Sequence, residues 1–419
     1  MPTMSMNVRV RLSIMMFLQY AFQGIWVIPL VTYLGKEGYT GSQIGSIYGT
    51  IALGFIIAPF FVGMIADKFF SAQKVLGVMN ILAGVLLLLA SKMAVAADGT
   101  PQFSVFFWIM LAHCICYTPS WALTNTIALS QMSDPGKQFP GIRVMGTIGW
   151  IVVSAVTLLG PTLKINIEAT NLPMIIGAVI GIVTGVFSFM LPSTPPKVTD
   201  HKTTIGDIIG IKALGLMKDS NFAIFVMCSF LIMLPGTFYW TFCNGFLNEI
   251  GMEFAQFKQS TGQMSELVFM LIMPFFFARF GVKKMLLIGM LAWVGRFVCF
   301  AFGDLGSTAF LLYMGLILHG VCFDFFFVTG QLYTDKKAPK EIQASAQGFI
   351  SLITFGLGWL VGTKLAGLVV DKFATEGGHN WKGIWLIPAV MAAVIAIIFF
   401  LSFHDKTVVG QDKPEQAAA

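Results

Sequence analysis

The chain has 419 residues, of which 56% are hydrophobic and only 11% are charged, and its net charge is +6. Soluble domains hold about 25% charged residues, so this composition excludes an ordinary soluble globule. A bilayer tolerates apolar outer faces on helices, and the mean hydropathy of +0.80 fits that setting. We therefore expect an integral membrane protein whose partner is the lipid bilayer and not nucleic acid.

Membrane-spanning helices need about 20 apolar residues. The apolar runs of this chain are long and continuous rather than alternating at period two, which excludes a β-barrel. The sequence predicts an all-α protein with twelve spans, at Leu12–Leu34, Gln43–Ala66, Val75–Ser91, Phe103–Leu129, Gly141–Leu163, Leu172–Leu191, Phe222–Leu247, Gln259–Ala278, Met285–Phe302, Thr308–Gly330, Ala344–Val370 and Ile384–Phe403. We interpret the first as a retained span and not a signal peptide.

The longest polar connection lies near the middle of the chain and suggests two six-helix bundles. We expect the bundles at residues 1–191 and 222–403, a cytoplasmic linker at 192–221 and a cytoplasmic tail at 404–419. Within the linker, Ile205 to Met217 is either a short amphipathic surface helix or a plain tether. Most Lys and Arg residues fall on one side of the predicted spans, so the positive-inside rule places both termini in the cytoplasm.

A partial repeat supports the division into halves. Gly63-Met-Ile-Ala-Asp67-Lys68 ends the second span, and Ala278-Arg-Phe-Gly281-Val-Lys283-Lys284 ends the eighth. Both are incomplete copies of the signature G-x-x-x-D-[RK]-x-G-[RK]-[RK]. The chain thereby resembles the major facilitator superfamily, which implies that fold and a scaffold that works as a monomer.

Ionisable residues inside spans are candidates for function, because a charge at a helix centre costs about 2.5–3.5 kcal/mol on insertion scales. Within the predicted spans, four such residues stand out: Arg143, Glu266, Arg296 and Asp324. We interpret Arg296, together with Lys364, as structural or snorkelling. The others are candidate site residues, with Arg143 near enough to the cytoplasmic side to snorkel.

Further polar and aromatic residues share helix faces with these charges. The stripes comprise Arg143, Thr147 and Trp150; Gln263 and Glu266; His319 and Phe323, with Asp324 beside them; Gln23 with its neighbours; and Thr237 with Trp240. Such residues can join helices by hydrogen bonds worth about 0.6 kcal/mol, or they can line a cavity. A cavity of this kind would bind hydroxyl groups and stack on a flat ring, which leaves both nucleosides and sugars open.

Four runs narrow the choice. Residues 139–150 (FPGIRVMGTIGW), 262–266 (GQMSE) with PFFF at 274–277, 322–326 (CFDFF) and 344–348 (ASAQG) resemble the bacterial nucleoside–proton symporter family within that superfamily. The resemblance covers essentially the whole chain. It implies nucleoside uptake across the bacterial inner membrane.

By position, the resemblance implies that Arg143, Thr147 and Trp150 contact nucleoside, that Gln263 and Glu266 hold ribose or base, and that Phe323 stacks on the substrate. It also implies that Asp324 is needed for transport. The chain departs from the family pattern at His319, where Tyr is expected, and at Thr237 and Trp240, where Gln and Asn are expected.

The predicted mechanism is alternating access about a midplane site. Glu266 or Asp324 would take a proton, because burial favours the neutral form of a carboxyl. A sugar–proton symporter is the nearest alternative. A membrane enzyme or an ATP-driven pump is disfavoured, because no Ser-His-Asp signature, HExxH or P-loop is recognisable. A channel is also disfavoured, because the sequence shows no re-entrant segment that could form a selectivity filter. The six cysteines lie in apolar segments, so we expect no metal site, disulfide or cofactor.

Overall fold

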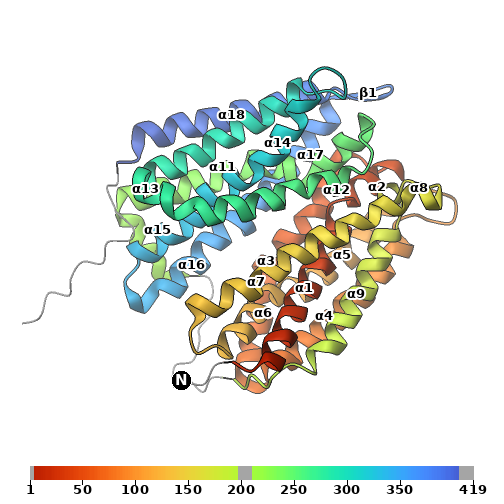
Figure 1. The fold of residues 1–419 in the computed structure, drawn as a ribbon. Helices are drawn as coiled ribbons and strands as arrows, with labels where there is room; N and C mark the ends of the chain where they lie inside the picture. The colour runs from red at the N-terminus through yellow and green to blue at the C-terminus, as the bar shows by residue number, and fades with distance from the viewer. Residues whose placement is uncertain (1–3, 197–209, 405–419) are drawn as a thin grey trace, which may run out of the picture. The chain divides into compact units, whose positions relative to one another are not determined.

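The computed structural model describes residues 4–196 and 210–404, and it leaves the side chains of 60–69 and 211 outside the description. Helices make up most of the described chain (Figure 1). In chain order the elements are α1 Met6–Val27, α2 Leu30–Lys36, α3 Gly41–Phe69, α4 Ala72–Met93, α5 Phe103–Tyr117, α6 Pro119–Ser130, α7 Pro135–Ser154, η1 Ala155–Leu159, α8 Gly160–Leu163, η2 Ile167–Ala169, α9 Leu172–Ser188, η3 Ile211–Lys218, α11 Ser220–Glu249, α12 Ala255–Gln259, α13 Thr261–Phe302, α14 Ala309–Cys322, η4 Phe323–Val328, α15 Thr329–Lys337, η5 Lys340–Ile342, α16 Gln343–Ser351, η6 Leu352–Gly358, α17 Trp359–Lys372, β1 Ala374–Thr375, β2 Gly378–His379 and α18 Trp381–Ser402.

Apolar helices account for all twelve predicted spans. Ten helical stretches of the described residues are long and apolar enough to cross a bilayer, and α9 is a shorter apolar helix. One stretch contains α13, whose 42 residues would measure about 63 Å if straight. That is twice the hydrocarbon thickness of about 30 Å. The backbone of Gly281, with φ 67° and ψ 179°, interrupts α13 between the predicted eighth and ninth spans.

The described chain packs into two compact units. The first unit comprises the described residues of Met1–Ile205 with Thr237–Ser260 and Phe355–His379. The second unit comprises those of Gly206–Gly236, Thr261–Thr354 and Asn380–Ala419. The predicted boundaries of the two bundles at 1–191 and 222–403 remain a prediction.

In the first unit, close helix pairs position the polar residues. α1 packs along α7, α4 along α9, and α3 along α17. A Cβ on Gly149 of α7 would overlap the carbonyl oxygen of Phe17 on α1, so only glycine lets the two backbones approach this closely. This close contact fixes the orientation of α1 relative to α7, and therefore the positions of Gln23 on α1 and Trp150 on α7.

In the second unit, α13 packs along α14 and α18. A Cβ on Gly320 of α14 would lie 2.7 Å from the backbone nitrogen of Glu266. The Ser265 hydroxyl accepts a hydrogen bond from the Gly320 backbone N–H at 3.0 Å. These contacts bring the Gln263–Glu266 turn of α13 next to the polar end of α14.

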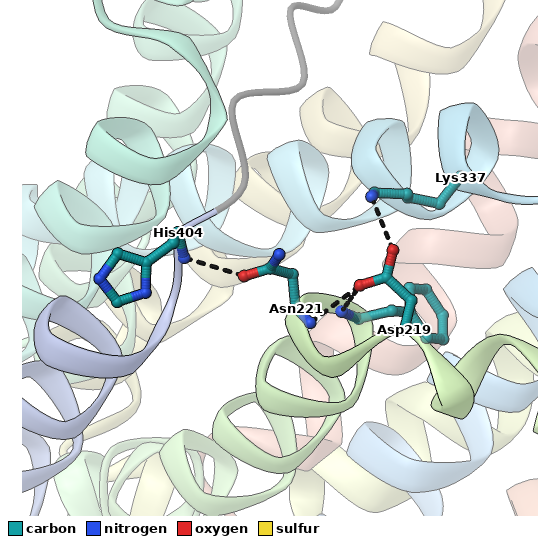
Figure 2. A network of polar contacts seen from close by, with 5 residues as sticks. Asp219, Asn221, Lys337 and His404 are labelled. Carbon is teal, nitrogen blue, oxygen red and sulfur yellow. Dashed lines mark hydrogen bonds and ion pairs between the residues drawn. The ribbon is translucent and has the colours of Figure 1, made fainter.

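A polar network joins three chain segments of the second unit (Figure 2). Asp219 accepts a hydrogen bond from Lys337 Nζ at 3.0 Å and another from the backbone N–H of Asn221 at 2.8 Å. The Asn221 side-chain oxygen accepts one from the backbone N–H of His404 at 2.9 Å. The network therefore fastens the start of α11 to the ends of α15 and α18.

Several sequence predictions fall partly outside the described residues. Of the segment from Ile205 to Met217, for which a surface helix and a plain tether were both open, residues 205–209 are not described, and Ile211–Lys218 forms a 3-10 helix. The predicted tail at 404–419 lies outside the description except for His404. Helix α3 runs through the first signature copy, but the side chains of Gly63–Lys68 are among those not described.

Candidate functional site

The face of α7 predicted from sequence packs against α1 in the first unit. The Arg143 guanidinium lies 4.3 Å from the centre of the Tyr20 ring, in the range of a cation–π contact. One and two turns further, Thr147 is buried and the Trp150 ring packs against Gly24 of α1. The Trp150 indole N–H is buried with no hydrogen-bond acceptor among the described residues.

A hydrogen-bonded chain extends from the predicted residue Gln23 into α5 and α6. The Gln23 side-chain oxygen accepts from the Tyr117 hydroxyl at 3.1 Å, and the same hydroxyl accepts from the Trp121 indole N–H at 2.9 Å. The Trp121 ring also stacks on Tyr20, with centroids 6.5 Å apart. Sequence reasoning missed Tyr117 and Trp121, although their spacing of four residues places both on one face of the predicted fourth span.

The part of α11 that belongs to the first unit carries Thr237 and Trp240. Thr237 is fully buried, and the Trp240 ring stacks on Trp359 of α17 with centroids 5.1 Å apart and planes at 20°. The Trp359 indole N–H donates to the Tyr48 carbonyl oxygen of α3 at 3.3 Å. Trp240 therefore belongs to an aromatic pair whose second member the sequence did not single out.

In the second unit, His319 is paired with Arg296. An Arg296 Nη1 lies 3.0 Å from His319 Nδ1, and both side chains are buried. Because a guanidinium can only donate, the imidazole accepts at Nδ1. The Arg296 guanidinium also lies 5.2 Å from the Trp293 ring and 5.8 Å from the Phe300 ring. Arg296 is thus fully buried inside the unit, which favours the structural alternative of the sequence interpretation over snorkelling.

The turn of α13 that carries Gln263 and Glu266 lies beside this pair. Gly262 packs against His319, and its Cβ position lies 3.0 Å from the His319 Cβ. The Gln263 side chain is half-buried, and its carbonyl oxygen has no donor among the described residues. The turn that carries the Gln263 amide and the Glu266 carboxyl therefore lies beside His319. The His319 ring lies 6.0 Å from the Phe323 ring.

Asp324 lies in a π-helical turn, η4, and its side chain is 0% exposed. Within the described residues, neither of its carboxyl oxygens has a hydrogen-bond donor. The Glu266 carboxyl is near enough to interact electrostatically with it. Single wide π-turns in helices are frequent at functional sites, and an unpaired buried carboxylate is costly. The structure thus brings the two predicted acids, Asp324 and Glu266, near each other in the second unit.

A separate cavity in the first unit is lined by Lys364 but by none of the candidate site residues. Its volume is about 650 Å³, and its walls come mainly from apolar residues of α3, α5 and α17. Among the described residues, no group of three His, Cys, Asp or Glu side chains is arranged to hold a metal ion.

Apolar helices that can cross a bilayer, combined with buried ionisable and aromatic side chains, are typical of a multi-pass membrane transporter. A family model described as nucleoside H+ symporter matches residues 6–408. YegT of Escherichia coli (strain K12) is 42% identical over 96% of this chain and 95% of that protein. The xanthosine permease of the same organism is 33% identical over 96% of this chain and 97% of that protein.

A solved structure supports the same family assignment. A crystal structure of a mutant form of the nucleoside transporter NupG superposes with a TM-score of 0.88 at 29% identity, covering 95% of this chain and 100% of that chain. The chain belongs to the nucleoside H+ symporter family and has the twelve-helix major facilitator fold. It is a nucleoside transporter and not an enzyme, so the predicted family, fold and class are confirmed.

Proposed function

We propose that the chain takes up nucleosides together with protons by alternating access, and that Asp324 is the coupling acid. The observation that carries the proposal is the Asp324 carboxyl, which is fully buried without a donor among the described residues and lies beside Glu266. Burial without a partner favours the neutral, protonated form of a carboxyl. The proton would therefore enter with the substrate and leave when the site meets the cytoplasm.

Substrate binding is assigned to the polar and aromatic residues of each unit. In the first unit these are Gln23, Arg143, Thr147, Trp150, Thr237 and Trp240; in the second they are Gln263, Glu266, His319 and Phe323. Aromatic faces would stack on the base, and the Gln263 amide with the Glu266 carboxyl would bind ribose hydroxyls. The indole N–H of Trp150 and the carbonyl oxygen of Gln263, both lacking partners among the described residues, support this assignment.

The driving force can be stated in order of magnitude. One charge that moves through 100 mV is worth about 2.3 kcal/mol. At about 1.4 kcal/mol per tenfold, one proton supports roughly fortyfold accumulation of a neutral nucleoside. We also propose that the carrier works as a monomer in the bacterial inner membrane with both termini in the cytoplasm.

Asp324→Asn tests the coupling. In proteoliposomes with an imposed proton gradient, the variant should lose concentrative uptake of labelled uridine or adenosine but keep nucleoside exchange without a gradient. Asp304→Asn is the matched control, because Asp304 lies on an exposed loop, and it should accumulate nucleoside like the parent. Concentrative uptake by Asp324→Asn would contradict the assignment.

Glu266→Gln separates the two acids. If Glu266 binds substrate, this variant should bind nucleoside more weakly but still accumulate it at saturating concentration. Loss of accumulation with unchanged nucleoside binding would instead make Glu266 the coupling acid. Competition by unlabelled sucrose or maltose as strong as that by adenosine would favour the sugar alternative.

A further inference from the structure

The cavity of the first unit that lies apart from the candidate site is an open groove between α3, α5 and α17. Its volume of about 650 Å³ is within the range of ligand sites, which is about 300–1,000 Å³. Val361 and Leu368 of α17 border it and are 47% and 53% exposed. Because all three helices belong to stretches that can cross a bilayer, this groove opens toward lipid.

The walls of the groove are apolar except at one residue. Phe103 and Phe107 of α5 lie one helical turn apart, with ring centroids separated by 5.8 Å, and form an aromatic wall. On α17, Leu360, Lys364 and Leu368 follow at intervals of four residues and share one face of the helix. A single cation therefore lies among side chains that suit an acyl chain.

The Lys364 ammonium is held at the level of Ser46 on α3. Its Nζ donates to the Ser46 hydroxyl oxygen at 3.0 Å, and that hydroxyl donates to the Ser42 carbonyl oxygen at 2.7 Å. Ser46 lies five residues beyond the start of α3, or about 8 Å along the helix axis. An ammonium has three N–H donors, and the described residues offer Lys364 one acceptor and no carboxylate. The protein therefore leaves this charge without a counter-charge inside the span.

The one acidic residue of α17 is engaged elsewhere. Asp371 accepts hydrogen bonds from the backbone N–H groups of Gly41 and Ser42 at 2.5 and 2.9 Å, and another from the Ser42 hydroxyl. The carboxylate thus caps the N-terminus of α3, where negative charge is favourable. Lysines within membrane spans normally pair with an opposite charge or with carbonyl groups. For Lys364 an anion from the surrounding bilayer can supply that partner.

We propose that the groove binds one anionic phospholipid, with its phosphate at the Lys364 ammonium and an acyl chain along the walls formed by Phe103, Phe107 and Leu368. The phosphate oxygens accept the N–H donors that Ser46 leaves unused. Since α3 packs along both α5 and α17, the bound lipid bridges all three helices. The inference goes beyond the proposed function and requires neither nucleoside binding nor proton coupling.

The single positive charge selects the class of headgroup. A zwitterionic headgroup carries its own ammonium or quaternary amine, which competes with Lys364 for the phosphate. An anionic headgroup such as that of phosphatidylglycerol has no internal cation, so its attraction to Lys364 is not offset. One lysine near anionic lipid should favour this headgroup about fivefold, which corresponds to about 1 kcal/mol.

Photo-crosslinking in nanodiscs tests the site directly. The carrier is reconstituted in neutral phosphatidylcholine, without nucleoside or gradient, together with a phosphatidylglycerol or a phosphatidylcholine probe at equal mole fraction. Both probes carry the same acyl chains with a diazirine, so they differ only in the headgroup. Peptide mass spectrometry then measures the crosslinking yield on the α5 and α17 peptides that line the groove.

In the parent protein the phosphatidylglycerol probe should label these peptides about fivefold more than the phosphatidylcholine probe. Lys364→Gln should remove that preference, and Lys364→Arg should retain it. Lys92→Gln is the matched control, because Lys92 is an exposed lysine in the last turn of α4 and does not line the groove. It should leave the preference unchanged. Leu368→Trp places a larger side chain in the groove and should lower the yield of both probes together.

Equal yields of the two probes in the parent protein would overturn the inference, because the groove would then hold lipid without selection by charge. A preference that persists in Lys364→Gln, or yields that Leu368→Trp leaves unchanged, would also overturn it. A groove that neither probe labels, in a carrier that native mass spectrometry shows to be dimeric, would assign this surface to a second copy of the chain. If Lys364→Gln does not fold, the parent comparison and Leu368→Trp decide.

The result is independent of the Asp324 experiment, since no substrate or gradient is present. Failure of the lipid inference leaves the coupling assignment intact, and failure of that assignment leaves the crosslinking yields interpretable.

Discussion

Gly320 offers the sharpest structural perturbation of the second unit. In Gly320→Ala the added Cβ would lie 2.6 Å from the Ser265 carbonyl carbon and 2.7 Å from the Glu266 nitrogen. Ordinary contact begins at 3.4 Å, so α13 and α14 must separate by several tenths of an ångström. Both obstructing atoms are backbone, and no side-chain rotation can relieve the overlap. Overpacking of this kind costs about 1–3 kcal/mol.

Separating α13 from α14 would move Gln263 and Glu266, which lie on α13, away from His319 on α14 and from Phe323, which directly follows α14. Loss of one substrate hydrogen bond, worth about 1–1.5 kcal/mol, lowers affinity about tenfold. We therefore expect Gly320→Ala to lower the thermal stability of the purified carrier and to weaken nucleoside binding about tenfold. Binding is measured calorimetrically, and stability by heating followed by size-exclusion chromatography.

Gly295→Ala is the matched control on the same helix pair. The nearest atom to its added Cβ is Leu318 Cδ1 of α14, at 3.7 Å, which is ordinary contact. An alanine there should stabilise the helix by about 0.5–1 kcal/mol and leave nucleoside binding unchanged. Equal behaviour of Gly320→Ala and Gly295→Ala would refute the reasoning.

Two further predictions concern polar pairs of the second unit. His319→Leu removes the acceptor for Arg296 and should reduce stability by about 1.5–3 kcal/mol, whereas His319→Asn, whose side-chain oxygen can replace Nδ1, should recover part of the loss; identical melting curves for the two would argue against the pair. The hydrogen bond and charge of Lys337 hold the pKa of Asp219 below its usual range. The stabilisation of the folded protein by this pair is therefore present above the ordinary pKa of an aspartate, and it is lost as the pH falls through the lowered pKa of Asp219. Because Asp219 is 41% exposed, the pair contributes less than about 1 kcal/mol to stability. In Asp219→Asn the melting temperature should fall less steeply at acidic pH than in the parent protein, and an unchanged pH dependence would contradict this assignment.

Much of the fold was predictable because a bilayer imposes a simple length and composition rule on each span. Even the interruption of α13 was anticipated, since the basic residues around Gly281 ended one apolar run and began another. The π-helical turns at η4 and η6 could not be predicted, because a single extra residue per turn barely changes the hydrophobic pattern.

The candidate site was predictable only as faces of single helices. Sequence placed Arg143, Thr147 and Trp150 on one stripe, but it could not reveal that Tyr20 lies under the guanidinium or that Tyr117 reaches Gln23. Such pairs depend on which helices pack together. The burial of Glu168, which is 2% exposed, also could not be predicted, because a glutamate between two spans is ordinarily solvated.

Direct detection of proton movement with nucleoside tests the central claim. Proteoliposomes that contain the purified carrier and a trapped pH indicator are given adenosine or uridine outside, with no gradient and with the membrane potential clamped. Coupled entry predicts that the lumen acidifies as labelled nucleoside enters and that Asp324→Asn abolishes the acidification. Nucleoside entry by the parent protein with no change in lumenal pH would contradict the account.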